Sequence, residues 1–359
     1  MPSFGISTPQ GNYSAVVERG VLRSISHYLP ASKGKIFVVT TADVWRFVEP
    51  AVREGLGDRG FDCIFLPGGE EQKRLAPLET AAEEMMRLGG DRSSMVLAVG
   101  GGIVTDMGGF LAAIFMRGIP VVQVPTTLLA QVDAAIGGKT GVNLVSGKNL
   151  IGSFHQPFAT LIDPAVLDTL PEREYRAGLF EVVKHGIIKS PALFQLMDRQ
   201  PRDVMARQKD AVDYMICESV RIKAEVVSAD ERESDLRKIL NFGHTFGHAL
   251  ESETEYKRFL HGEAVSWGMT AAVWLANMRG MIDDGTRDQM FHCIDAYGPL
   301  PSLEGIKAEA LQGRLTADKK TVQGKIHFIL PTRIGEVVVV SDVPPEQSLR
   351  AIERALAPA

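Results

Sequence analysis

The sequence is poor in cysteine, and its cysteines lie far apart. Cys63, Cys217 and Cys293 are the only three in 359 residues. Their odd number and wide spacing match neither a disulfide framework nor a zinc-binding cysteine motif. We therefore expect free thiols in a reducing compartment, and a fold that depends on a hydrophobic core rather than on covalent cross-links.

Long apolar runs, a basic excess and a leader segment are also lacking. The longest apolar segments, such as 110–116, are far shorter than the roughly 20 residues that cross a bilayer. The first residues, 1–5, have neither the charged nor the apolar region of a signal peptide. The formal net charge is −5, so we do not expect the basic stripe of a nucleic-acid-binding protein. These absences favour a cytoplasmic protein whose partners are neither nucleic acids nor membranes.

What is present is an ordinary globular composition, with 45% hydrophobic and 23% charged residues. A chain of this length holds two domains or one large one. Its N-terminal half alternates short β-branched runs with amphipathic segments, which predicts an α/β domain with a Rossmann-like, doubly wound parallel sheet. The expected strands are 4–6, 13–18, 35–40, 62–66, 95–99 and 121–124, and the expected helices are 42–56, 77–88 and 104–116.

The stretch 241–251, Asn-Phe-Gly-His-Thr-Phe-Gly-His-Ala-Leu-Glu, has the most distinctive chemistry in the chain. If it is helical, His244 and His248 project from one face about one turn apart. Arg237 and Asn241 would lie earlier on the same side. From this spacing alone both histidines are candidates to bind one metal ion. The alternative is a pair of core histidines bonded to backbone groups.

Further metal-binding residue types occur elsewhere in the chain. A His-Gly-Glu sequence occupies 261–263, and Glu181 interrupts an otherwise apolar helical segment. A carboxylate with two imidazoles is a common ligand set for a catalytic zinc ion that keeps one coordination position open. The sequence therefore favours a catalytic metal centre.

Two glycine-rich stretches suggest anion binding. Gly100, Gly101 and Gly102 follow an expected strand and precede a helix, where backbone amides and the helix dipole favour a phosphate. The spacing is not G-x-G-x-x-G, because Thr105 occupies the last glycine position. We therefore expect an unusual dinucleotide site, or else a plain tight turn with Asp106 as a helix cap.

The second stretch, 125–157, reads as a glycine- and hydroxyl-rich loop. It carries Lys139 and Lys148 between apolar segments, and such a loop suits a bound anion. The alternative is a solvated connecting loop. A glycine-rich stretch of this length is seldom needed merely to join two elements, so we favour the anion-binding interpretation.

Taken in order, these motifs resemble those of the 3-dehydroquinate synthases, in the sugar-phosphate cyclase superfamily. The similarity runs from about residue 35 to residue 320. It rests on GGGxxxD (100–106), FMRG (115–118), PTTLLAQVD (125–133), GGKTGVN (137–143), GKN (147–149), FHQP (154–157), TLPERE (169–174), EVVK (181–184), IKAE (222–225), NFGHTFGH (241–248) and HGE (261–263).

The resemblance implies a phosphate-eliminating carbon–oxygen lyase. Such an enzyme converts 3-deoxy-D-arabino-heptulosonate 7-phosphate to 3-dehydroquinate and phosphate, the second step of the shikimate pathway. It does so by transient oxidation with NAD, β-elimination, reduction and intramolecular aldol closure. The resemblance also implies a zinc or cobalt ion, a homodimer, an NAD-binding α/β domain (1–168) and a mainly helical metal- and substrate-binding domain (169–359).

The resemblance implies a role for each matching residue. It places the metal on Glu181, His244 and His261 and makes His248 a substrate-facing group. The remaining catalytic and substrate-binding positions are Arg117, Asp133, Lys139, Lys148, Asn149, Lys184, Lys223, Arg237, Asn241 and Lys320 or its neighbour Lys319. The NAD-binding positions are Asp43, Glu70, Lys73, Gly101, Gly102, Ile103, Asp106, Thr126, Thr127, Lys139 and Lys148. For any one of these lysines taken alone, a solvated surface group is the alternative.

Some positions depart from the family pattern. Thr41 stands where these enzymes usually have an acidic residue that holds the adenosine ribose. Asp43 either takes over that role or caps the following helix. Thr105 replaces a common glycine, and Phe180 replaces a common alanine before the metal-binding glutamate.

Three other interpretations remain open. A 2-deoxy-scyllo-inosose or 2-epi-5-epi-valiolone synthase would share the fold, although Gly137-Gly138-Lys139 and Arg237 are of the dehydroquinate type. A metal-dependent polyol dehydrogenase would release NADH. An inactive binding protein is disfavoured, because every metal and anion position that can be matched is filled.

Overall fold

The computed structural model describes residues 2–31, 34–317 and 326–357, which fold as two compact units. The first unit comprises Met1–Pro171 and Ile216–Arg232, and the second comprises Glu172–Met215 and Glu233–Ala359. This differs from the expected single division between 168 and 169, because the chain returns to the first unit for 216–232. In that segment Lys223 forms an ion pair with Asp133, and the Ser228 hydroxyl accepts a hydrogen bond from the Ser7 amide.

A seven-stranded sheet forms the centre of the first unit, in the order β1-β2-β9-β6-β5-β3-β4. The β1–β2 hairpin is antiparallel and the other pairs are parallel. Strands β3, β5, β6 and β9 are buried along their whole length, which explains why their sequences are mostly apolar. The strands are Ser3–Thr8, Gly11–Val17, Ile36–Thr40, Phe61–Phe65, Met95–Gly100, Val121–Pro125 and Ala159–Ile162 for β1 to β6 and β9.

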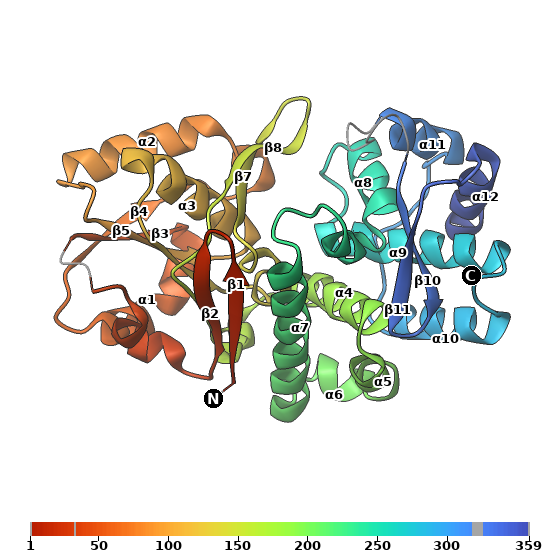
Figure 1. Cartoon of the computed structure of the whole chain (residues 1–359), viewed down its shortest axis with the longest axis horizontal. Coiled ribbons are helices and arrows are strands. Elements are labelled where there is room, and N and C mark those ends of the chain that lie inside the picture. Colours follow the sequence, from red (N-terminus) through yellow and green to blue (C-terminus); the bar gives the residue numbers. More distant parts are fainter. Residues whose placement is uncertain (1, 32–33, 318–325, 358–359) are drawn as a thin grey trace. The chain divides into compact units, whose positions relative to one another are not determined.

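Helices cover both faces of this sheet (Figure 1). On one face, Ile36 and Val38 of β3 pack with α1 (Ala42–Leu56) and the 3-10 segment η1 (Val21–Tyr28). On the other, Phe37 and Val39 pack with α2 (Leu75–Arg87) and α3 (Gly102–Ile114). Successive residues of β3 thus supply two cores, as the two-residue period of a strand requires. The predicted doubly wound α/β fold is confirmed.

The glycine-rich segment that we expected to be a loop is a β-hairpin. Strand β7 (Lys139–Leu144) pairs antiparallel with β8 (Gly147–Phe154). Gly141 lies opposite Gly152, and a Cβ atom on Gly152 would come within 2.0 Å of the Thr140 carbonyl oxygen. The glycines therefore serve close approach of two strands, a use that the sequence pattern alone does not distinguish from a flexible loop.

The second unit is mainly helical, as expected. Helix α9 is buried over most of its length, and the Trp267 indole on it donates to the Ala355 carbonyl on α12. Near the end of the chain, β10 (Phe328–Arg333) and β11 (Glu336–Val340) form an antiparallel hairpin. The helices are α4 (Glu172–Ile188), α5 (Pro191–Arg199), α6 (Pro201–Met205), α8 (His244–Glu253), α9 (His261–Met278), α10 (Asp284–Asp295), α11 (Ala308–Ala317) and α12 (Pro345–Leu356), while α7 (Lys209–Ala229) belongs to both units.

The expected helical face running from Arg237 to His248 is interrupted. Leu236–Asn241 forms the 3-10 turn η6, and Gly243 adopts a left-handed φ of 79° before α8 begins at His244. Glycine reaches this conformation without steric cost. Arg237 and Asn241 therefore do not share a helical face with His244 and His248, and the one-face argument holds for the two histidines alone.

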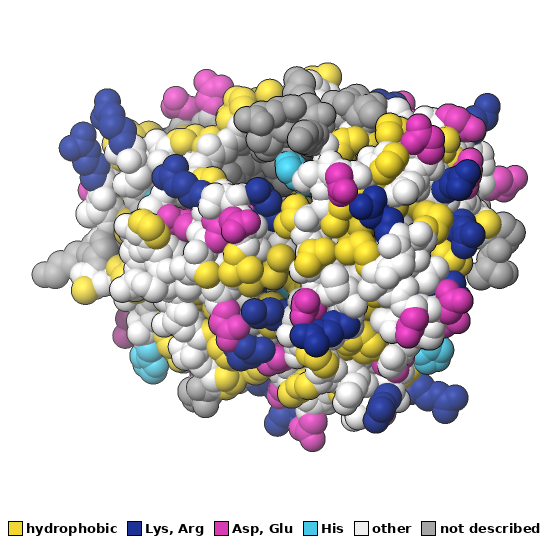
Figure 2. Space-filling model, turned by 45° about the vertical axis from the view of Figure 1, so that its right-hand side comes forward, with side chains coloured by type: hydrophobic (Ala, Val, Ile, Leu, Met, Phe, Trp, Pro, Cys, Tyr) yellow, Lys and Arg dark blue, Asp and Glu magenta, His cyan; other side chains and the backbone are white. Residues whose placement is uncertain are grey.

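Three features bear on what the protein contacts. Cys63, Cys217 and Cys293 are all free thiols. None of the helices that the structure describes combines the length and apolar character needed to cross a membrane. On the face shown in Figure 2, basic and acidic side chains are interspersed rather than gathered by sign.

Candidate active site

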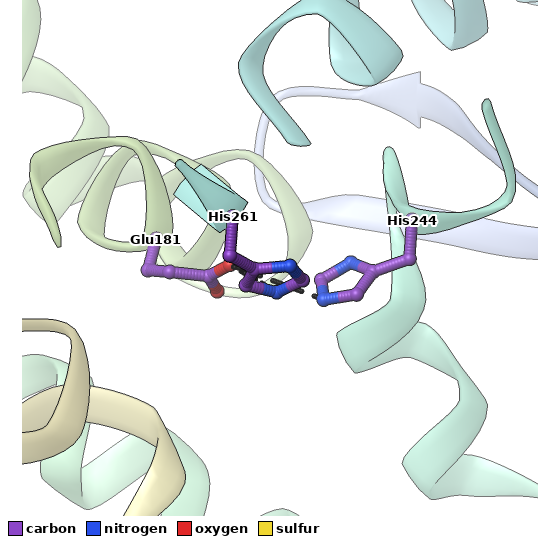
Figure 3. Close-up of side chains that lie close together, drawn as sticks. All are labelled: Glu181, His244 and His261. Atoms are coloured by element: carbon purple, nitrogen blue, oxygen red, sulfur yellow. Dashed lines mark ion pairs between the residues drawn. The ribbon is translucent and has the colours of Figure 1, made fainter. Parts of the chain in front are cut away.

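Three side chains from three helices of the second unit point toward one another (Figure 3). Glu181 lies in the middle of α4, His244 is the first residue of α8, and His261 is the first residue of α9. One ligand atom from each lies within 4.8 Å of the other two. The Nε2 atoms of His244 and His261 are 3.9 and 3.8 Å from the Oε1 atom of Glu181.

The remaining polar atoms around this group favour a divalent cation. Glu181 is fully buried and its Oε2 atom pairs with Lys184, so Oε1 faces the two imidazoles. The Nδ1 atom of His244 lies 3.2 Å from the Phe242 carbonyl oxygen, which leaves Nε2 available as a ligand. Ligand atoms around a tetrahedral zinc ion lie about 3.3 Å apart, so the two histidine nitrogens are each about half an ångström farther from Glu181 than such a site requires. The residues present thus fit a zinc-like ion.

His248 lies beside this group rather than within it. Its ring centroid is 5.4 Å from that of His244 and 5.9 Å from that of His261. His248 is half-buried. It forms a second group of possible metal ligands with Glu251 and His261, whose ligand atoms lie within 4.8 Å of one another. Arg237 is buried in η6, and the Asn241 amide donates to Glu233.

A second cluster of predicted site residues forms in the first unit around the buried Lys73. The Lys73 ammonium donates to Asp106 at 2.5 Å and to the Asn149 side-chain oxygen at 2.6 Å. Asn143 extends the cluster. Its side-chain amide donates to Glu70 at 2.8 Å, and its side-chain oxygen accepts from the backbone N–H of Asn149 at 2.9 Å. The Lys148 ammonium lies 3.7 Å from Glu70. Asp106 therefore pairs with a lysine and does not cap a helix.

The glycine turn lies at the carboxyl ends of β5 and β6. Gly101 precedes the first residue of α3, and a Cβ atom on it would lie 2.9 Å from the Thr127 side chain. The Thr126 amide donates to the Gly100 carbonyl at 2.9 Å. Ligands of open α/β sheets bind at this edge. The structure thus gathers there five of the residues predicted to bind NAD, namely Gly101, Gly102, Ile103, Thr126 and Thr127.

Other predicted residues lie outside these clusters. Asp133 of η4 (Ala130–Ala134) pairs with Lys223 of α7. Lys139 is exposed at the start of β7, and Arg117 is exposed in η3 (Phe115–Arg117). Asp43 is exposed in the first turn of α1, where Thr41 is the N-cap. Lys319 and Lys320 lie outside the described residues.

Several residues around the metal group escaped the sequence analysis. Glu251 is 1% exposed and lies 3.4 Å from the Nδ1 atom of His261. Arg173 binds both carboxylate oxygens of Glu263, at 2.7 and 2.8 Å. The sequence does contain a signal for Glu251, because this acidic residue stands seven positions after His244 and so lies on the same helical face. Arg173 and Glu263 stood inside quoted motifs without a role.

Replacing Lys73 by Met should destabilise the protein in a pH-dependent way. Burial raises the pKa of the Asp106 carboxyl, and Lys73 opposes that rise. Without Lys73 the pKa of the Asp106 carboxyl rises further. The carboxyl is then neutral at low pH, and at high pH it is charged and largely shielded from water without its ammonium partner. We expect a loss of about 3 kcal/mol in unfolding free energy at pH 8, shrinking as the pH falls toward the raised pKa.

Urea unfolding of the cofactor-free protein at several pH values measures this effect. Lys257→Met is the matched control, because it breaks an exposed pair with Glu255. Exposed pairs contribute little, so this control should change stability slightly at every pH. An equal loss at all pH values in Lys73→Met would contradict the prediction.

Comparison with known proteins shows the family to which the chain is similar. Residues 63–177 match the family described as "3-dehydroquinate synthase N-terminal", and residues 178–321 match "3-dehydroquinate synthase C-terminal". A 3-dehydroquinate synthase from Solibacter usitatus (strain Ellin6076) is 64% identical over 357 residues, which cover 99% of this chain and 100% of the relative.

Solved structures of related cyclases share the whole fold. ValA, a 2-epi-5-epi-valiolone synthase from Streptomyces hygroscopicus subsp. jinggangensis 5008 with NAD+ and Zn2+ bound, matches with a TM-score of 0.88 at 30% identity, over 97% of this chain and 98% of that one. A 2-deoxy-scyllo-inosose synthase complexed with carbaglucose-6-phosphate, NAD+ and Co2+ matches with a TM-score of 0.86 at 25% identity, over 98% and 99%.

The sequence matches span both units, and the 64% identical relative covers nearly the whole chain. The two cyclase structures reproduce the two-unit fold at lower identity, as relatives with other names. The chain belongs to the 3-dehydroquinate synthase family.

Proposed function

We propose that this protein converts 3-deoxy-D-arabino-heptulosonate 7-phosphate to 3-dehydroquinate and phosphate, using NAD and a zinc or cobalt ion. The observation that carries the proposal is the convergence of Glu181, His244 and His261 in a chain 64% identical to a 3-dehydroquinate synthase. When bound, NAD+ would take up and return a hydride, while the metal ion would act as a Lewis acid on the substrate oxygens.

The protein's own residues bind and orient a substrate that carries a phosphate, a carboxylate and several hydroxyls. Arg237 suits the carboxylate, because a planar guanidinium binds carboxylates with two parallel hydrogen bonds. His248, beside the metal group, is our candidate to move a hydroxyl proton. The departing phosphate can act as its own base, so a further protein base is not required. Cations for the phosphate end are Arg117, Lys139, Lys148 and Lys320, with Lys184, Lys223, Asn241, Asp133 and Asn149 around the ring.

NAD is assigned to the first unit. The glycine turn before α3 would let the dinucleotide phosphates approach backbone amides at a helix N-terminus. The polar cluster of Glu70, Lys73 and Asp106 would hold the part of the cofactor beyond that turn. Asp43, exposed in the first turn of α1, is our candidate for the adenosine ribose. We also propose a homodimer in the cytoplasm, which sedimentation and cell fractionation would test.

One assay tests the function and separates it from its alternatives. The protein is incubated with the heptulosonate phosphate, NAD+ and Zn2+, while released phosphate and NADH absorbance are followed. We expect phosphate release without accumulation of NADH, because the hydride returns to the product. A polyol dehydrogenase would accumulate NADH, and a cyclase for another sugar phosphate or a binding protein would release no phosphate from this substrate.

Replacing His248 by Asn should slow turnover by about 100- to 10,000-fold, the usual contribution of a positioned acid–base group. The zinc content should stay unchanged, because His248 lies beside the metal ligands and not among them. Phosphate release and metal analysis of the same preparation measure both. Loss of zinc together with activity would mean that His248 is a ligand.

A further inference from the structure

We propose that Glu251 is a positioning residue for the metal centre, whose carboxylate accepts the Nδ1–H of His261 and so directs the Nε2 atom of that imidazole toward Glu181. The proposal rests on the proposed function only in taking Glu181, His244 and His261 as the metal ligands. It concerns how strongly the protein holds the ion, which can be measured without substrate.

The stripe of side chains on α8 provides the geometry. His244, His248 and Glu251 follow one another at positions i, i+4 and i+7, so they share one face of the helix. The His261 ring lies against this face, with its centroid 5.2 Å from that of His244. Its Nδ1 atom is 3.4 Å from both carboxylate oxygens of Glu251, while its Nε2 atom is 3.8 Å from Glu181.

One imidazole therefore lies between two buried carboxylates. Glu251 is 1% exposed and Glu181 is 0% exposed. A neutral imidazole has one N–H donor and one acceptor nitrogen, and an ionised carboxylate only accepts. Donation to Glu251 thus leaves the Nε2 lone pair directed at the metal position. A carboxylate partner also makes the ligand nitrogen more basic and strengthens its bond to a cation.

The two histidine ligands are supported in different ways. His244 has a neutral backbone acceptor, the Phe242 carbonyl at 3.2 Å. His261 has a charged side-chain acceptor, which a substitution can remove. Burying a carboxylate is costly, so a residue needed only for packing at position 251 would be apolar. The carboxylate at position 251 is explained by the Nδ1–H of His261, which needs a hydrogen-bond acceptor.

The main chain at His261 is held separately from its ring. Glu263 accepts a hydrogen bond from the Leu260 amide at 2.8 Å, and Arg173 of α4 binds both of its oxygens. This arrangement fixes the first turn of α9 against α4. Glu251 touches the ring itself, so removing it should disturb the ring's orientation and leave the helix in place.

Zinc affinity of the metal-free full-length protein, measured by competition with a chelating indicator, tests the proposal. We expect Glu251→Ala to weaken zinc binding by about 10- to 100-fold. Glu251→Gln should lose less, because an amide oxygen still accepts from Nδ1. Glu253→Gln, on the same helix and paired with Arg314, is the matched control and should bind zinc as the wild type does. The absorption spectrum of the cobalt-loaded protein should change in Glu251→Ala alone.

Two results would overturn the proposal. The first is unchanged zinc affinity in Glu251→Ala with unchanged thermal unfolding of the metal-free protein. The second is binding of two ions by the wild type that falls to one in the variant, since Glu251 would then be a ligand with His248. If Glu251→Ala does not fold, the Gln variant decides, with unchanged affinity counting against us. Normal zinc titrations without phosphate release would contradict the proposed function alone.

Discussion

Replacing Glu181 by Leu should lower the rate of phosphate release by on the order of 1,000-fold or more. The variant loses the carboxylate that faces both imidazoles, and with it the charge that binds a divalent cation. A Lewis-acid metal contributes several kcal/mol of transition-state stabilisation, and about 1.4 kcal/mol corresponds to a factor of ten. Metal analysis should find the ion missing, and phosphate release measures the activity.

The same substitution should destabilise the metal-free protein by about 3–5 kcal/mol, because it removes one partner of a buried ion pair. Lys184 is 1% exposed and would keep its ammonium without this carboxylate. Adding Lys184→Met replaces both charges with apolar side chains, which is often neutral or stabilising. The double variant should therefore regain stability in urea while remaining inactive and free of metal.

This pair of variants separates folding from metal binding. If the double variant regained stability and still bound the metal ion, Glu181 would be a structural residue and the metal assignment would be wrong. Metal content decides this rather than activity, because Lys184 is itself a proposed substrate-binding residue. If neither variant lost stability, the Glu181–Lys184 pair would contribute nothing to the fold. The single and double variants have to be compared in the presence of a chelator, since bound metal would itself add stability.

Gly262→Ala should strongly destabilise the second unit. A Cβ atom on Gly262 would lie 1.9 Å from the Ala177 carbonyl oxygen of α4. That oxygen belongs to the backbone of a buried helix and cannot turn away, so α4 and α9 must separate. We expect a loss of roughly 3 kcal/mol in unfolding free energy, the upper end of the range for an overpacked core. Zinc affinity should fall as well, because Glu181 and His261 are carried by these two helices.

Gly313→Ala in α11 is the control for this prediction. Nothing lies within 4 Å of a Cβ atom there, and alanine is favoured over glycine inside a helix by about 1 kcal/mol. This variant should be as stable as the wild type or more stable, with unchanged zinc affinity. Urea unfolding and zinc titration of both variants measure the contrast, and equal stability of the two would contradict the close-packing argument.

Local patterns predicted much of the first unit. Helix α1 has the bounds that its amphipathic segment predicted, 42–56, and the buried strands β3 and β5 stood out as short apolar runs. The equally buried strand β9 was not predicted. The errors lie where glycine has more than one use. Helix α3 begins at Gly102 rather than near 104, and 139–154 pairs as a hairpin instead of forming a loop. Glycine permits a turn, a helix start and close strand pairing alike, so its presence does not distinguish them.

The division of the chain shows the same limit at longer range. A boundary near 168 follows from the change in local pattern, since the elements after it are helical. The return of 216–232 to the first unit depends on contacts such as Lys223 with Asp133, between residues 90 positions apart. The spacing of apolar residues along a short segment cannot reveal a contact between residues so far apart in the chain.

By itself, the sequence determined the types of side chain available for chemistry, the family, and the alternation of strands and helices, because these depend on residue identity and near-neighbour spacing. Residue spacing alone paired His244 with His248, and the family resemblance named Glu181, His244 and His261 instead. The tertiary structure brings these three side chains together, leaves His248 beside them, and alone sets Glu251 behind the His261 ring. The physical reason is that helix packing sets the distance between side chains on different helices, and the glycines between α4, α8 and α9 set how closely those helices pack.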